Sequence, residues 1–158
     1  MSITAKALAI VDDFSSLQGN DKLDLLIEIS DRLPALPERY LNHPELLERV
    51  EECQSPVYLF VEVDDGTVQI FLTAPKEAPT TRAFAGILHA SLDGESVDTV
   101  LSFDDDYPSM LGITDMVSPL RMRGMRGMLA RIKRQVAEKN QLPTSRKTLR
   151  PDTRESTG

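Results

Sequence analysis

The segment 57–72, VYLFVEVDDGTVQIFL, decides the fold of this chain. It holds two runs of β-branched and aromatic residues, and each run is long enough for one strand. Asp65 and Gly66 lie between the runs, and glycine adopts the positive φ of a tight hairpin turn without steric cost. The sequence therefore predicts a β-hairpin in the middle of the chain, with strands near 57–63 and 68–72.

Two amphipathic helices are predicted before the hairpin, at residues 3–17 and 21–33. Apolar residues recur among polar neighbours at roughly helical spacing in both segments. The residues that we expect to face the core are Ile3, Leu8, Phe14 and Leu17 in the first segment, and Leu23, Leu26, Ile27 and Leu33 in the second. Pro34 and Pro37 then end the helical pattern, because proline lacks the amide proton that a helix interior needs.

Further helices are predicted after the hairpin. We expect Thr80 or Thr81 to cap the first of them and Gly94 to end it. Its apolar residues are Phe84, Ile87 and Leu88. Shorter helical segments are expected to begin at Ser96 and Asp104.

The clearest helix signal begins at Ser118. Serine is a preferred N-cap, and Pro119 suits the first helical position because its missing amide proton would have no partner there. One face of this helix carries Met125, Met128, Leu129, Ile132 and Val136. Beyond Asn140 the apolar pattern ends, and we expect residues 141–158 to form a disordered polar tail.

These elements predict an α+β fold in which a small antiparallel sheet, either a hairpin or three strands, packs against helices. The length of 158 residues and the hydrophobic content of 41% suit one domain, which we place at residues 1–140. No segment is long and apolar enough to span a membrane, so we expect no membrane partner. The N-terminal residues lack the basic start and long apolar run of a signal peptide.

The charge of the chain is divided unevenly along the sequence. The net charge is −7, but residues 1–117 contain 7 basic and 22 acidic side chains, whereas residues 118–158 contain 11 basic and 3 acidic ones. A basic helix packed against an acidic body would explain this division. The alternative is a module that binds RNA or another anionic partner through Arg121, Arg123, Arg126, Arg131, Lys133 and Arg134. These cations scatter around the helix without interleaved aromatic residues, so we expect no nucleic-acid partner.

Cys53 is the only cysteine, and it lies between the second predicted helix and the hairpin. It has no partner for an intrachain disulfide, and with only 2 histidines beside it no cysteine-rich zinc site can form. A single cysteine also indicates a reducing compartment, so we expect the protein in the cytoplasm. One interpretation of the residue is a small buried hydrophobe, which is a frequent role of free cysteine. Its polar neighbours, Glu51, Glu52, Gln54 and Ser55, instead suggest a thiol on a polar loop tip.

Two kinds of cysteine chemistry can be compared. Hydrolysis or acyl transfer needs a histidine beside the thiol, and the candidates are His43, next to Pro44, and His89, inside a predicted helix. Thiol exchange needs only a thiolate that attacks a sulfur of a persulfide or disulfide. The carboxylates beside Cys53 should raise the pKa of its thiol, because negative charge disfavours the thiolate. We therefore expect an exchanging thiol that a partner activates.

Four motifs, in this order along the chain, resemble the SufE family of sulfur acceptors, also called cysteine desulfuration proteins. Segment 25–40, LLIEISDRLPALPERY, is similar to the second helix of that family with its Leu-Pro ending. Segment 52–56, ECQSP, resembles the Cys-Gln-Ser/Thr loop that bears the sulfur-accepting cysteine. Segments 78–86, APTTRAFAG, and 118–124, SPLRMRG, resemble the starts of two later helices.

The resemblance implies an α+β fold similar to that of iron–sulfur scaffold proteins, without a metal or cofactor of its own. It implies that Cys53 accepts persulfide sulfur from a SufS-type cysteine desulfurase, stimulates that enzyme, and delivers sulfur for cluster assembly on a scaffold complex of the SufBCD type. The pyridoxal phosphate would belong to the desulfurase, so this chain would be an acceptor and activator rather than a stand-alone enzyme. A monomer and a homodimer are both compatible with the sequence. A chaperone-like acidic adaptor without chemistry is a further alternative, and it would tolerate Cys53→Ser.

The same resemblance implies roles for residues around the cysteine and a sheltered position for its sulfur in the free protein. Glu52, Gln54 and Ser55 belong to the cysteine loop, and we expect Gln54 and Ser55 to shape it through hydrogen bonds. Arg121 matches the arginine at the start of the last helix, and it would brace the loop or contact a partner. Arg82 has the same two interpretations. For both arginines the alternative is an ordinary surface residue.

Overall fold

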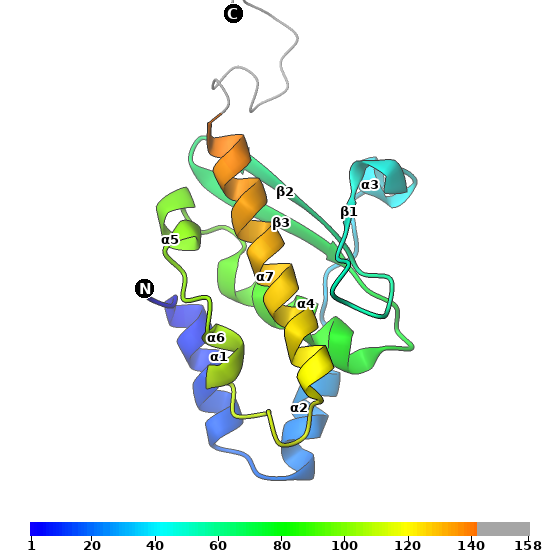
Figure 1. Ribbon diagram of the computed structural model, residues 1–158, viewed down its shortest axis with the longest axis vertical. Helices are drawn as coiled ribbons and strands as arrows, with labels where there is room; N and C mark the ends of the chain where they lie inside the picture. Colours follow the sequence, from blue (N-terminus) through cyan, green and yellow to red (C-terminus); the bar gives the residue numbers. More distant parts are fainter. Residues whose placement is uncertain (142–158) are drawn as a thin grey trace, which may run out of the picture.

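The computed structural model describes residues 1–141, which form an α+β fold (Figure 1). A three-stranded antiparallel sheet has the order β1-β2-β3, with β1 at Glu48–Arg49, β2 at Tyr58–Asp64 and β3 at Thr67–Thr73. Both the fold class and the small antiparallel sheet were predicted. The third strand is the two-residue β1, which precedes the cysteine loop.

The central hairpin follows from its sequence. Asp65 and Gly66 have φ angles of 53° and 79°, as the predicted tight turn between β2 and β3 requires. In the register of the pair, Phe60 lies opposite Phe71 and Val61 opposite Ile70. Burial alternates along both strands, so that one face of the sheet is buried beneath helices.

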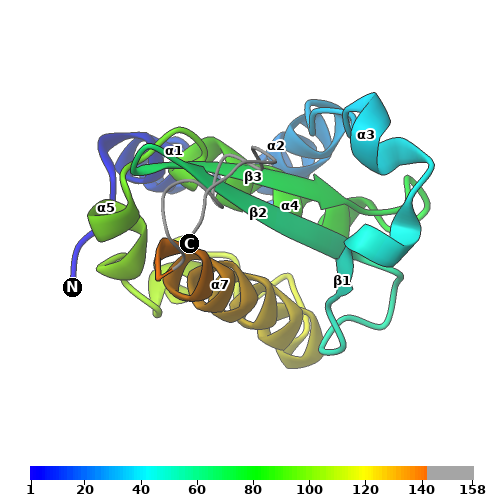
Figure 2. The same cartoon turned by 90° about the horizontal axis from the view of Figure 1, so that it is seen from above.

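Two long helices pack against the sheet, and a helical layer packs beyond one of them. Helix α4 (Pro79–Leu92) contacts β3, and helix α7 (Pro119–Asn140) contacts β2 and runs along the whole sheet (Figure 2). Helices α1 (Ala5–Ser15) and α2 (Asn20–Asp31) pack on α4. The shorter elements are α3 (Glu38–Leu41), the 3-10 helix η1 (Pro44–Leu46), α5 (Val97–Leu101) and α6 (Tyr107–Met110).

The capping predictions are correct at two helices. The Ser118 hydroxyl accepts a hydrogen bond from the Arg121 amide at the start of α7, with Pro119 at the first helical position. Ser96 likewise caps α5 by accepting from the Thr99 amide. All the predicted apolar residues of α7 are buried: Met125, Met128, Leu129, Ile132 and Val136.

Two other helix starts differ from the prediction. Helix α4 begins at Pro79 after Ala78, which makes no side-chain cap, so Thr80 and Thr81 lie inside its first turn. The segment after Asp104 becomes helical only from Tyr107, because the Asp104 carboxylate first accepts the Asp106 amide in a turn. A proline start in the first case and turn chemistry in the second therefore outweighed the side-chain capping signals.

The buried faces of α1 and α2 also differ in part from the prediction. Leu8, Leu23 and Ile27 are 50%, 41% and 44% exposed. Ala7 is buried instead of Leu8, and consecutive positions lie about 100° apart around a helix. Leu26 is likewise buried beside the exposed Ile27. The predicted helical period was right. The buried faces of α1 and α2, however, are turned away from Leu8, Leu23 and Ile27.

Helix α7 also covers a free edge of the sheet. The short strand β1 pairs with Tyr58 and Leu59 of β2, which leaves the rest of that edge to other partners. The Val61 amide donates to Gln135 Oε1 at 2.9 Å, and Lys139 Nζ donates to the Val61 carbonyl oxygen. Gln135 and Lys139 thus give hydrogen-bond partners to the main-chain groups of Val61, which would otherwise be unpaired at this edge.

The predicted domain boundary at residue 140 coincides with the last residue of α7, Asn140. Apart from Gln141, the predicted tail at 141–158 lies outside the described residues. Between residues 1 and 141, no helix is both long and apolar enough to cross a membrane.

Candidate functional site

Cys53 lies on the loop 51–56, which joins β1 to β2. The Val50 amide donates to the Val57 carbonyl oxygen at 2.9 Å and closes the base of this loop. The Cys53 amide donates to the Val50 carbonyl oxygen at 3.1 Å, which turns the cysteine back toward the body of the protein. The loop therefore holds its tip residue at a defined place beside α7.

The thiol is buried although its neighbours are exposed. Cys53 is only 7% exposed, whereas Glu51, Gln54 and Pro56 are exposed. A Cβ atom built on Gly124 of α7 would lie 2.9 Å from Cys53 Sγ, so the sulfur sits directly on the helix backbone. The predicted loop is present, but the thiol is not at an exposed tip, because Gly124 makes room for it. A sheltered sulfur is also what the family resemblance implied.

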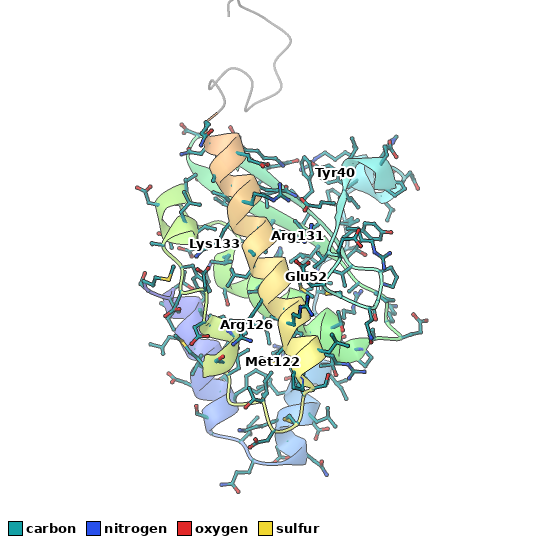
Figure 3. All side chains as sticks on the ribbon, viewed as in Figure 1. Tyr40, Glu52, Met122, Arg126, Arg131 and Lys133 are labelled. Atoms are coloured by element: carbon teal, nitrogen blue, oxygen red, sulfur yellow. The ribbon has the colours of Figure 1, made fainter. Side chains whose placement is uncertain are left out.

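Glu52 attaches the loop to the same helix. A Cβ atom on Gly127 would lie 2.7 Å from Glu52 Cδ, so the carboxylate side chain also crosses α7 at a glycine. Arg131 Nε donates to Glu52 Oε1 at 2.9 Å (Figure 3). Arg131 Nη1 also donates to Glu48 Oε2 at 2.5 Å. The hydrogen bond from Arg131 lowers the pKa of Glu52, so this carboxylate is ionised at neutral pH.

Gly124, Gly127 and Arg131 are spaced three and four residues apart, which places them on one face of α7. Together they form the seat of the cysteine loop. Each glycine inside a helix costs roughly 0.5–1 kcal/mol relative to alanine, so two of them need a packing reason. From the sequence we expected Gly124 only as part of a helix start, and we missed Gly127 and the role of Arg131. The pair of interior glycines was the available signal.

A pocket of about 380 Å³ opens beside the thiol. Gln54 and Ser55 border it from the loop, as do Thr80 and Thr81 from the first turn of α4. Arg121 lines it from the first turn of α7, and its side chain is exposed. The structure thus brings Arg121, Gln54 and Ser55 together with Cys53.

Arg82 is engaged elsewhere. Its Nε donates to the Ser30 carbonyl oxygen at 3.0 Å, and its Nη1 donates to the Ala74 carbonyl oxygen at 2.5 Å. It therefore ties the end of α2 to the residue that follows β3, and it is not among the residues that line the pocket of Cys53. In the described part of the chain the interpretation of Arg82 as a brace of the cysteine loop fails, because its guanidinium donates to these two carbonyl groups instead.

Burial raises the pKa of the Cys53 thiol to about 11, and the Glu52 carboxylate adds to this rise. Arg131 and Arg49 act in the opposite direction. The pKa of the thiol is raised, as predicted, but the largest cause of the rise is loss of solvent rather than the neighbouring negative charge. In this seat the thiol stays protonated at neutral pH and is a weak nucleophile.

Comparison with known proteins identifies the family of this chain. The family model of SufE, the Fe-S metabolism associated domain, matches residues 8–136. The chain belongs to the SufE family. The match includes the cysteine loop, its glycine seat on α7 and the pocket beside them, so the resemblance seen in the sequence is confirmed.

Two curated relatives and one solved structure are also similar to this chain. An uncharacterized SufE-like protein of Mycobacterium tuberculosis (strain H37Rv) is 46% identical over 138 residues, which are 87% of this chain and 95% of the relative. An uncharacterized SufE-like protein of Rhizobium meliloti is 27% identical over 128 residues, covering 78% of this chain and 89% of the relative. The solution structure of a hypothetical protein from Thermus thermophilus shares 33% identity and a TM-score of 0.76, covering 87% of this chain and 97% of that one.

Neither histidine of this SufE-family chain serves Cys53 in the structure. His43 Nδ1 lies 3.1 Å from Glu45, and His89 Nε2 lies 3.8 Å from Asp93. Neither residue lines the pocket beside the thiol. In the described part of the chain, no group of three or more His, Cys, Asp or Glu side chains could hold a metal ion. The site thus offers a thiol without a histidine base beside it, which argues against a hydrolase that uses a Cys-His pair.

The basic helix of this SufE-family chain is largely paired with the acidic body. Arg126 pairs with Asp106, and Lys133 Nζ lies 2.7 Å from Asp105. Arg134 pairs with Glu48, which Arg131 also contacts. This pattern favours the intramolecular explanation of the charge division over an RNA-binding surface.

Proposed function

We propose that Cys53 accepts sulfur, as a persulfide, from the active-site cysteine of a SufS-type cysteine desulfurase and passes it on for iron–sulfur cluster assembly. Membership of a family associated with iron–sulfur metabolism supports this setting. The observation that carries the proposal is the placement of the single thiol, which is buried on a loop with exposed neighbours and borders a pocket of about 380 Å³. The pocket beside the thiol has room for one additional sulfur atom.

The transfer is an exchange between two sulfur centres. The Cys53 thiol gives its proton to solvent, and the thiolate attacks the terminal sulfur of the desulfurase persulfide. The sulfur–sulfur bond of the desulfurase breaks as a new one forms on Cys53, and the desulfurase cysteine leaves as a thiolate. No external oxidant or reductant is consumed, since one persulfide replaces another.

The loop has to leave its seat for this reaction. With the thiol pKa raised to about 11 by burial, very little thiolate exists at neutral pH, and α7 covers the sulfur. Movement of Cys53 into a desulfurase would remove the burial, and positive groups of that partner would stabilise the thiolate. This explains how a poor nucleophile in the free protein becomes an acceptor in a complex.

The same burial suits a carrier. A persulfide is easily oxidised, and a sulfur that returns to the seat on α7 is shielded from solvent by the loop and the helix. The carrier then delivers its sulfur to a scaffold complex of the SufBCD type, in the reducing cytoplasm. The protein itself uses no cofactor in this scheme, and the pyridoxal phosphate acts in the desulfurase. Removal of sulfur from the desulfurase would raise its turnover.

The proposal is tested by intact-protein mass spectrometry after incubation with a SufS-type desulfurase and cysteine. We expect a mass increase of one sulfur atom that a thiol reductant removes. The control is Cys53→Ser under the same conditions, which should gain no sulfur. A second measurement follows cysteine consumption by the desulfurase, which should rise with the wild-type chain and not with Cys53→Ser.

Two results would count against the proposal. Absence of the sulfur adduct with several SufS-type desulfurases would exclude Cys53 as the acceptor. Equal stimulation of the desulfurase by the wild-type chain and by Cys53→Ser would instead support the adaptor without chemistry.

A further inference from the structure

We infer that Arg131 is a positioning residue that holds the cysteine loop closed through Glu52, so that breaking this one ion pair releases the thiol of Cys53. This inference deepens the proposed function and rests on it for its biological meaning, because an acceptor thiol must leave its seat to react. The ion pair itself can be tested without any partner protein.

The first argument is the small number of polar contacts that hold the loop. Among the hydrogen bonds of residues 1–141, the one between Glu52 and Arg131 is the sole side-chain bond from loop 51–56 to α7. Cys53 and Glu52 also pack on Gly124 and Gly127, which offer no side chain to interlock with the loop. A charged hydrogen bond between partly buried groups, with exposed fractions of 22% for Arg131 and 32% for Glu52, is therefore the main polar link between the loop and α7.

The second argument is that Arg131 is held in place independently of the loop. Its Nη1 donates to Glu48 of β1, and Glu48 is in turn bound by Arg134 and by Gln135 Nε2 at 2.8 Å. The guanidinium is thus already oriented toward the loop before Glu52 arrives. Closing and opening of the loop therefore require only that Glu52 binds or leaves an arginine that is already in place.

The same arrangement makes opening reversible. When Glu52 leaves, Arg131 keeps its ion pair with Glu48, so no unpaired charge remains buried at the helix. Glu52 itself moves from partial burial into water, where a carboxylate is well solvated. Opening therefore costs one charged hydrogen bond and some packing, which a binding partner can supply.

A simple charge effect of Arg131 predicts the opposite outcome from a latch. The positive charge of Arg131 lowers the pKa of the Cys53 thiol, so its removal should make the closed thiol less reactive. Removal of a latch should make the thiol more reactive, because the open loop is populated more often. The sign of the change separates the two roles.

The experiment measures the rate at which iodoacetamide alkylates Cys53 in the full chain. We expect Arg131→Gln to raise this rate about tenfold, which corresponds to the loss of one charged hydrogen bond. The matched control is Arg126→Gln, which removes the same charge from α7 but breaks a pair with Asp106 away from the loop. It should leave the rate nearly unchanged. Amide hydrogen exchange should rise at residues 51–56 in Arg131→Gln and stay the same in β2.

A second variant keeps the inference testable if Arg131→Gln does not fold. Arg131→Lys retains the charge but lacks the planar fork that reaches Glu48 and Glu52 together, so it should also accelerate alkylation. Unchanged or slower alkylation in the folded variants would overturn the latch. So would faster exchange throughout the sheet, since it would indicate general loss of stability.

The result is distinguishable from the test of the proposed function. Faster alkylation of Arg131→Gln without a sulfur adduct on the wild-type chain would leave the latch standing and reject sulfur transfer. A sulfur adduct together with unchanged alkylation would reject the latch alone.

Discussion

At the scale of single residues, the reactivity of Cys53 depends more on where it lies than on the charges beside it. The thiol rests on Gly124, and burial is the largest cause of its raised pKa, ahead of Glu52. Arg131 opposes this rise while its ion pair keeps the loop in its seat. One arginine thus makes the closed thiol slightly more acidic and, in our inference, less accessible.

The raised pKa predicts the pH dependence of Cys53 alkylation. The thiolate is the reactive form, so the rate should rise about tenfold per pH unit and level off only near the folded-state pKa of about 11. The same chain unfolded in urea should level off near the ordinary value for cysteine, at about pH 8.5. A folded protein whose alkylation rate levels off at the unfolded value would show that the thiol is solvated.

At the scale of secondary-structure elements, α7 does three things at once. Its apolar face fills the core, its glycine and Arg131 face seats the cysteine loop, and Gln135 and Lys139 near its end bind the free edge of β2. Gln135 is 5% exposed, and its amide group joins Glu48 to Val61. The helix thereby fixes the position of β1, from which the loop starts.

Gln135→Leu should destabilise the protein by roughly 2 kcal/mol, because the buried Val61 amide loses its acceptor and leucine offers none. The measurement is the free energy of unfolding from urea denaturation. Glu138→Gln is the control, since it disturbs only the exposed pair with Arg134, and its effect should stay below about 0.5 kcal/mol. Equal stability of the two variants would mean that Gln135 does not support the sheet edge.

At the scale of the whole molecule, packing pairs most of the cations of α7 with acidic residues from the rest of the chain. The basic α7 lies along a body that carries most of the acidic residues, and its cations contact Glu48, Glu52, Asp105 and Asp106. Cations already paired within the protein gain little from a polyanion, and the remaining acidic surface repels it.

We therefore predict that the protein does not bind single-stranded RNA in about 0.15 M salt. Fluorescence anisotropy of a labelled oligonucleotide should stay constant up to protein concentrations of about 100 μM, the weak end of ordinary non-specific affinity. Tighter binding that weakens steeply as salt is added would revive the anion-binding alternative for α7.

The sequence by itself determined the hairpin, the start of α7 and the single thiol that we propose as the sulfur acceptor. Asp65-Gly66 specifies its turn, and Ser118-Pro119 specifies its helix start, through bonds and dihedral angles within a few residues. Four short motifs were enough to identify the SufE family, because each keeps its residues close together in the chain.

Only the tertiary structure decided that Cys53 is buried, that two glycines of α7 receive its loop, that Arg131 holds Glu52, and that Arg82 binds elsewhere. Glu52 and Arg131 are 79 positions apart, and Arg82 finds its carbonyl partners at Ser30 and Ala74. Local propensity carries no information about which side chains meet across such separations. Those contacts are fixed by how α7 packs against the sheet, and the packing depends on the whole core.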